Sequence, residues 1–186
     1  MGIDLTGDTA EVRRLLERVK TLESLGFQYD QAEASFELLI RRAQPDYQPP
    51  FKLIDFMLVV EKQRRPPSKH NVSDDMLSEV MVKITVNEEL MHTAAEGNGP
   101  VNALDAAMRK ALLQFYPSLA CVKLVDYKVR ILEESVGTGS QVRVLIESSD
   151  GVNEWHTVGS STNIIEASWL ALADSLEYWL IKYKPY

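Results

Sequence analysis

A loop that leads from an extended segment into an amphipathic helix occurs twice in this chain, and this repetition constrains the fold more than any other feature. The first loop follows His92-Thr93 and enters a helix expected over 100–115. The second follows His156-Thr157 and enters a helix expected over 162–183. Two further strand-like stretches precede each loop. The pattern predicts an α+β fold of two β-β-β-α units, because an internal repeat indicates one supersecondary unit used more than once.

The turn over 97–100 has the residues that a helix start needs. Gly97 and Gly99 relax the backbone, and Pro100 suits the first helical position, where no amide hydrogen is required. The unpaired amides at such a start favour a nearby carboxylate or phosphate. Most turns of this kind are nevertheless plain connections, so the turn alone leaves both interpretations open.

The two copies are aligned here through their helix starts. Matching Asn102 with Asn163 also places Asp105 opposite Glu166. The two His-Thr pairs then match after three residues are removed from the first loop. This alignment assigns different loop lengths to the two copies.

The strands of both units are indicated by alternation of apolar and polar residues. In the first strand, Ile54, Phe56, Leu58 and Val60 are expected to share one face. The six expected strands cover 51–62, 80–86, 89–95, 125–131, 142–146 and 154–158. Two three-stranded sheets with one helix each leave faces and edges that need a partner. We therefore expect a homodimer.

Two short helices are expected ahead of the β-rich part. The first has apolar residues at helical spacing before Gly26, and the second lies between Asp30 and Pro45. Neither helix carries a plausible catalytic group. The sequence therefore predicts a helical linker arm over 1–48 and a β-rich domain over 49–186, in which the repeats cover 51–116 and 117–186.

Composition and charge exclude several classes of protein. The chain is 45% hydrophobic and 25% charged, and it has no apolar run long enough to span a bilayer. Its net charge is −7 and its basic residues are scattered, which argues against nucleic-acid binding. The single cysteine, Cys121, excludes an internal disulfide. Because no export leader is recognisable, we expect a cytoplasmic protein.

No arrangement of residues indicates catalysis or metal binding. The chain lacks the common metal, phosphate-loop and serine-hydrolase motifs. His92 and His156 occupy repeat-related positions, which favours a structural role over that of a catalytic base. His70 with the nearby pair Asp74-Asp75 has no ligand spacing that indicates a metal. We expect no catalytic residue, no metal and no cofactor in this chain.

Several motifs, in this order along the chain, resemble the C-terminal regulatory domain of the 2-isopropylmalate synthases and their relatives. The segments 97–106, 124–127 and 159–167 resemble the family in general. A closer similarity to the (R)-citramalate synthase branch rests on 32–39, 92–100, 144–151 and 163–169. Together these segments cover most of the chain from about residue 11 onwards.

The resemblance implies a role in regulation. Full-length members of this family are acyltransferases that condense acetyl-CoA with a 2-oxo acid, here with pyruvate favoured, on an N-terminal metal-dependent TIM barrel. This chain contains no barrel, so it resembles the linker arm and the regulatory dimerisation domain alone. Its implied partners are a second copy, the catalytic barrel of the same full-length chain, and a branched-chain amino acid. Family members bind leucine or isoleucine at the dimer interface of this domain and are inhibited by it.

The resemblance also implies an effector site. The family's Gly-Asn-Gly-Pro turn, the start of its fourth strand, the Gly-rich turn after that strand and its second helix start line the pocket. The matching residues are Gly97, Asn98, Gly99, Pro100, Val101, Leu124, Tyr127, Ile131, Gly139, Ser140, Asn163 and Ile164. Strict alternation places Leu124 on the opposite face from Tyr127 and Ile131, so Leu124 joins them only if the regular strand begins after it.

Two other functions remain as alternatives. The domain could serve only dimerisation and have no effector site of its own. The third class is a self-sufficient enzyme, which an assay of CoA release from acetyl-CoA and pyruvate would detect. Leucine and isoleucine are not distinguished by the sequence, because one methyl position changes affinity by only about 1–3 kcal/mol.

Overall fold

The computed structural model describes residues 9–62, 76–132 and 139–183. His70 and the pair Asp74-Asp75, considered above as metal ligands, lie outside these residues. The elements, in chain order, are α1 (Thr9–Ser24), α2 (Glu33–Arg42), β1 (Lys52–Lys62), β2 (Met76–Val86), β3 (Glu89–Gly97), α3 (Pro100–Leu112), η1 (Pro117–Cys121), β4 (Lys123–Ile131), β5 (Val142–Ser149), β6 (Glu154–Ser161) and α4 (Ile164–Lys182).

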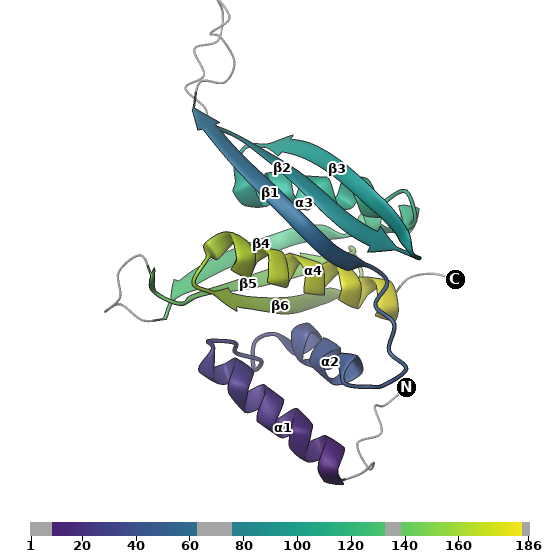
Figure 1. Cartoon of the computed structure of the whole chain (residues 1–186), viewed down its shortest axis with the longest axis vertical. Helices are drawn as coiled ribbons and strands as arrows, with labels where there is room; N and C mark the ends of the chain where they lie inside the picture. The colour runs from purple at the N-terminus through teal and green to yellow at the C-terminus, as the bar shows by residue number, and fades with distance from the viewer. Residues whose placement is uncertain (1–8, 63–75, 133–138, 184–186) are drawn as a thin grey trace, which may run out of the picture.

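The strands form two separate antiparallel sheets, ordered β1-β2-β3 and β4-β5-β6. The helix α3 follows the first sheet and packs on β2 and β3, whereas α4 follows the second sheet and packs on β5 and β6. In Figure 1, α3 is seen behind the first sheet and α4 in front of the second. The predicted α+β fold of two β-β-β-α units is confirmed.

The core lies between the sheets and the two helices, which also contact each other. The central strand of each sheet directs one row of side chains into it. Val80, Val82 and Ile84 of β2 are fully buried, and Val144 and Ile146 of β5 are buried in the same way. Each such side chain contributes about 1.5–3 kcal/mol by leaving water. The alternating pattern of the sequence therefore determines which face of each sheet receives its helix.

A β-bulge interrupts the first strand of each unit at the same place. The register shifts between Leu53 and Asp55 in β1, and between Leu124 and Asp126 in β4. An extra residue in one strand reverses the alternation on one side of it. The expected shared face in β1 is therefore wrong for Ile54, whose side chain is 57% exposed, whereas Leu53 packs against the core.

The helix starts align the two units without a gap. Gly99 is the N-cap of α3 and Asn163 is the N-cap of α4. The hydroxyl of Thr93 donates to the carbonyl oxygen of the residue 14 positions later, and the hydroxyl of Thr157 does the same in the second unit. Alignment of Asn102 with Asn163 is therefore wrong. Asn163 is equivalent to Gly99, because the loop before each helix has the same length.

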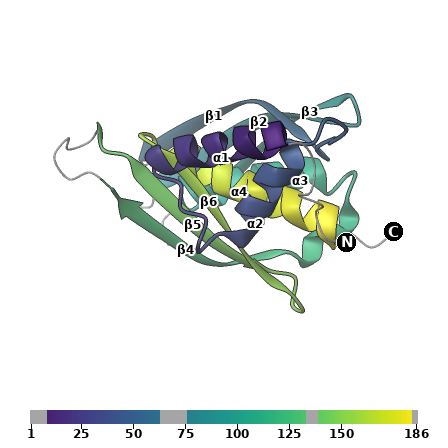
Figure 2. The ribbon, with the colours of Figure 1, turned by 90° about the horizontal axis from the view of Figure 1, so that it is seen from below.

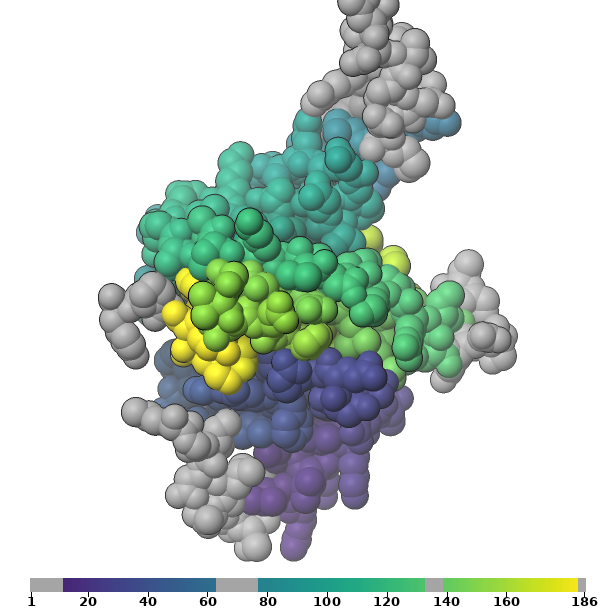
Figure 3. Space-filling view, turned by 180° about the vertical axis from the view of Figure 1, so that it is seen from behind, coloured from purple at the N-terminus to yellow at the C-terminus, as the bar shows by residue number. Residues whose placement is uncertain are grey.

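The arm lies against the second unit, on the side away from the first unit (Figures 1 and 3). Its second helix, α2, packs on β6 and on α4, and it lies in front of both in the view from below (Figure 2). Ala34 and Leu38 of α2 are completely buried. The backbone amides of His156 and Val158, on the free edge of β6, donate to side chains of α2. These contacts close one exposed sheet edge.

Candidate functional site

A cleft of about 670 Å³ lies between the first turns of α3, the short helix η1 and the beginning of β4. Three of the expected effector residues, Val101, Leu124 and Tyr127, line it together. The complete lining is Val101, Asn102, Asp105, Arg109, Ala120, Val122, Lys123, Leu124 and Tyr127. Its volume is in the range of small-ligand sites, which are usually concave, mostly apolar and equipped with a few polar groups.

The β-bulge in β4 explains how Leu124 and Tyr127 meet in one cleft. Residues three apart on a regular strand point to opposite faces. The register shift between Leu124 and Asp126 adds one residue, so both side chains pack against the core side of the sheet. Leu124 was expected to join Tyr127 only if the regular strand began after Leu124. The two side chains do share a face, but the cause is the bulge and not a later start of the strand.

Asp105 supplies the polar group of the cleft. Its Oδ2 accepts a hydrogen bond from Nε of Arg109 at 2.8 Å, and Nη1 of Arg109 donates to the carbonyl oxygen of Val122 at 2.7 Å. The other oxygen, Oδ1, is buried and has no hydrogen-bond partner among the described residues. A buried polar atom without a partner is rare and destabilising by about 1–3 kcal/mol. The arrangement therefore leaves one buried carboxylate oxygen unsatisfied, and a cationic donor that reached it would stabilise it.

The turn over 97–100 leads into the start of α3, beside this cleft. Gly99 is extended, with φ −172° and ψ 168°, and it makes no side-chain cap. Gly97 is required by close packing, because a Cβ there would lie 2.5 Å from the backbone nitrogen of Ala103. The amide of Asn98, an exposed residue, donates to Oδ1 of Asn102 at 3.3 Å. The turn immediately precedes Val101, but its own residues are not among those that line the cleft.

The hydroxyl of Tyr127 connects the cleft to the beginning of α4. It lies 2.7 Å from Oγ of Ser168, which in turn donates to the carbonyl oxygen of Ile164 at 2.6 Å. The side chain of Asn163 caps its own helix by accepting from the amide of Ile165 at 2.9 Å. Neither Asn163 nor Ile164 lines the cleft, and of the two only Ile164 is linked to it through Ser168.

The remaining expected site residues lie away from the cleft. Ile131 is at the far end of β4 and is 63% exposed. Gly139 and Ser140 precede β5, beside the loop that joins the arm helices, where Gln141 donates to the carbonyl oxygen of Leu25. This end of the second sheet borders the arm instead of α3.

The cleft residues that sequence reasoning did not propose include the ion pair of Asp105 and Arg109. The available signal was an acidic and a basic residue four positions apart on a helix, a spacing that places them in contact. That signal is common on solvated helix faces. Only the packing of η1 and β4 shows that one carboxylate oxygen of this pair is buried.

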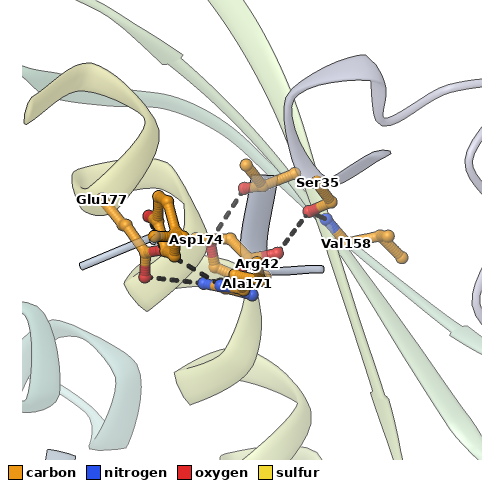
Figure 4. Close-up of polar contacts among 8 residues, drawn as sticks. Ser35, Arg42, Val158, Ala171, Asp174 and Glu177 are labelled. Carbon is orange, nitrogen blue, oxygen red and sulfur yellow. Dashed lines mark hydrogen bonds and ion pairs between the residues drawn. The ribbon is translucent and has the colours of Figure 1, made fainter. Parts of the chain in front are cut away.

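A second polar cluster holds the arm to α4 (Figure 4). Ser35 donates to Asp174 at 2.7 Å, and Arg42 contacts Asp174 at 2.8 Å and Glu177 at 2.7 Å. The hydroxyl of Ser35 also accepts from the amide of Val158. Burial raises the pKa of Asp174, and the charge of Arg42 offsets only part of this effect. Asp174 and Glu177 therefore lie on the face of α4 that meets the arm. Ser168, earlier in the same helix, contacts Tyr127 of the cleft.

The described parts of the chain contain neither a cluster of metal-ligating side chains nor a membrane-spanning helix. Within 9–62, 76–132 and 139–183, no three histidine, cysteine or acidic side chains are placed to hold a metal ion. Cys121 is exposed. None of the described helices is long and apolar enough to cross a membrane.

Comparison with known proteins identifies the family. The model of the LeuA allosteric (dimerisation) domain matches residues 30–180. The chain belongs to this family. The (R)-citramalate synthase of Geobacter sulfurreducens is 50% identical over 168 residues, which are 90% of this chain and 30% of that protein. The (R)-citramalate synthase of Aquifex aeolicus is 46% identical over 183 residues, or 97% of this chain and 33% of that protein.

More distant relatives of this LeuA domain include a 2-isopropylmalate synthase. The enzyme of that name from Aquifex aeolicus is 28% identical over 173 residues, which are 88% of this chain and 32% of the relative. The resemblance to the regulatory domain, and to the citramalate synthase branch in particular, is confirmed. The chain spans about a third of the length of the curated relatives it matches.

Proposed function

We propose that this LeuA domain is the regulatory part of a citramalate synthase or 2-isopropylmalate synthase, and that it binds a branched-chain amino acid for feedback inhibition. The observation that carries the proposal is the cleft between α3 and β4 with its unpaired carboxylate oxygen on Asp105. Leucine and isoleucine are both candidates.

The cleft has complementary groups for each part of such a ligand. Oδ1 of Asp105 would accept hydrogen bonds from the α-ammonium group, and charged partners make such bonds strong. The first amides of α3 that border the cleft, at Val101 and Asn102, would favour the α-carboxylate. Val101, Leu124 and Tyr127 would bury the branched side chain. A neutral apolar molecule would leave the carboxylate unsatisfied, which favours an amino acid.

Inhibition requires the ligand to prefer one of two arrangements of the protein. The helix α4 provides a path, because Ser168 contacts Tyr127 of the cleft and Asp174 and Glu177 contact the arm. A ligand that shifts Tyr127 would change the position of α4 relative to the arm. The arm would transmit this change to a catalytic domain that precedes it in the full-length chain.

The remaining parts of the proposal concern the whole protein. We propose a full-length acyltransferase that condenses acetyl-CoA with a 2-oxo acid, with pyruvate favoured, in the cytoplasm. The names of the relatives, (R)-citramalate synthase and 2-isopropylmalate synthase, support the synthase part of this proposal. Its divalent metal and acetyl-CoA would bind to the catalytic barrel and not to this domain. Membership in a dimerisation family supports a homodimer.

The proposal is tested by isothermal titration of the purified chain and its Asp105→Asn variant with isoleucine and leucine. The variant retains the shape of Asp105 but removes its charge, so we expect binding to weaken at least 10-fold. The matched control is Asp55→Asn, because Asp55 forms an exposed ion pair with Lys83 at 3.1 Å, outside the cleft. Equal affinity of all three proteins would place the site elsewhere.

A dimerisation module without an effector site is the second candidate. It is favoured by exposed apolar side chains along β1, where Ile54 is 57% and Met57 is 51% exposed. A folded dimer that takes up no branched-chain amino acid would support this alternative.

A further inference from the structure

The pseudo-symmetry of the domain creates a second position equivalent to the cleft. The bulge at Leu53 in β1 corresponds to the bulge at Leu124 in β4, and the next inward residues are Phe56 and Tyr127. Phe56 pairs with Val82 of β2, and Tyr127 pairs with Ile146 of β5. The first strand of each unit therefore presents the same backbone to the helix of the other unit.

The two helices are also equivalent residue by residue. Gly99 and Asn163 are the N-caps, and Asp105 and Trp169 each stand six positions after their cap. By the same count Arg109 corresponds to Ala173. The Asp-Arg pair of the first helix is thus replaced by a tryptophan and an alanine in the second.

These side chains fill the second position. The ring of Trp169 stacks on the ring of Phe56, with centroids 5.4 Å apart and planes at 19°. Trp169 is 5% exposed, and Phe56 packs against the core. An indole is far larger than a carboxylate, so it occupies the space that stays open beside Asp105. The same backbone therefore forms an open cleft in one place and a closed contact in the other.

We propose that Trp169 closes a second copy of the ligand cleft and thereby limits each chain to one amino-acid site. The ligand in this inference rests on the proposed function. The closure itself does not, because it follows from the pairing of Trp169 with Phe56 at the position equivalent to Asp105 and Tyr127. Trp169 accordingly determines how many amino-acid molecules one chain binds.

The first test transfers the Asp-Arg pair to α4 in the double variant Trp169→Asp/Ala173→Arg. Titration with isoleucine and leucine should show one molecule bound per chain in the original protein and two in the variant. The matched control is Leu172→Ala, because Leu172 is a buried core residue of the same helix and does not stack on Phe56. A folded variant that still binds one molecule per chain would overturn the inference.

The second test does not depend on amino-acid binding. Crystals of Trp169→Ala under xenon pressure should show a xenon atom beside Phe56, where crystals of the original protein show none. Absence of xenon from this position would mean that the core collapses around the smaller residue, and it would overturn the inference. No amino-acid binding by the original protein, with xenon present in the variant, would contradict the proposed function alone.

Discussion

The two β-β-β-α units share a backbone plan but differ in how their outer edges are covered. In the second unit, the edge strand β6 donates the amides of His156 and Val158 to Glu33 and Ser35 of α2. In the first unit, Lys110 reaches from α3 to the carbonyl oxygen of Ala94 on the edge strand β3. Lys110 is equivalent to Asp174, the residue that Ser35 and Arg42 contact.

This difference shows how one repeated fold acquires two roles. The first unit contributes α3 to the cleft, and the second unit contributes both β4 to the cleft and a docking surface to the arm. The helix α4 touches both features, and the proposed function uses this helix to connect the cleft with the arm. Substitutions at the points where the two units differ test this contrast.

The largest effect is expected at Gly159 of β6, which is equivalent to Ala95 of β3. A Cβ at Gly159 would lie 1.9 Å from the carbonyl oxygen of Ala167, so β6 and α4 would have to separate. We expect Gly159→Ala to reduce the free energy of unfolding by about 3 kcal/mol or more. Urea denaturation measures this change.

The control for that variant is Gly99→Ala. A Cβ at Gly99 would meet no atom within 4 Å, and its extended backbone suits any residue. The expected cost is at most about 1 kcal/mol, from the change of helix cap. Equal costs for the two variants would contradict the close approach of β6 to α4.

The contact between the arm and the second unit is tested by Arg42→Ala. Loss of the guanidinium would leave Asp174 and Glu177 without their cationic partner, and the side chains of these acids are only 13% and 6% exposed. We expect a loss of about 2–3 kcal/mol in the free energy of unfolding.

The neighbouring variant Arg41→Ala is the control, since the ion pair that Arg41 forms among the described residues lies within its own helix, with Glu37 at 2.7 Å. Its removal should change stability by about 0.5 kcal/mol. Protease sensitivity of the arm should rise in the Arg42 variant and not in the Arg41 variant. Similar behaviour of both would mean that the cluster does not hold the arm.

The turn between β5 and β6 contains a carboxyl group with a lowered pKa, that of Asp150. Desolvation raises the pKa of Asp150, but hydrogen bonds from Asn153, Val152 and Trp179 outweigh it and hold this pKa below its ordinary value. A carboxylate with a lowered pKa stabilises the fold above the unfolded pKa of about 3.9, and this stabilisation disappears as the pH falls further.

Between pH 5 and pH 3, the original protein should therefore lose up to about 1 kcal/mol more stability than Asp150→Asn, because only the unfolded chain takes up a proton at this carboxyl group in that interval. Denaturation at several pH values measures the difference. Parallel pH profiles of the two proteins would show that the hydrogen bonds to Asp150 do not depend on its charge.

A small effect is expected for Tyr127→Phe. The substitution removes the hydroxyl that lies 2.7 Å from Oγ of Ser168, and Ser168 keeps its bond to the carbonyl oxygen of Ile164. We expect a loss of about 1 kcal/mol in stability. Tyr127→Ala, which also removes the ring from the cleft, should weaken binding of the amino acid in a chain that remains folded and dimeric. Unchanged affinity of the alanine variant would move the site.

The sequence predicts the units, the sheets and the helices because periodicity and the glycine and proline residues mark them clearly. It does not predict the bulges, because one extra residue at Ile54 or Val125 leaves the apolar composition of the strand unchanged. It brings Val101, Leu124 and Tyr127 together only through the family resemblance. The unpaired oxygen of Asp105 depends on packing between segments that are distant in the sequence, which no local pattern records.

The central claim is that an amino acid binds in the open cleft and not in its closed counterpart, and amide chemical-shift mapping tests it most directly. On addition of isoleucine or leucine to the labelled chain, we predict that the largest shifts fall within 98–109, 122–127 and the beginning of α4 around Ser168. Shifts centred on Phe56, or on α1 and β6, would contradict the account. The absence of shifts from a folded dimer would contradict effector binding by this chain altogether.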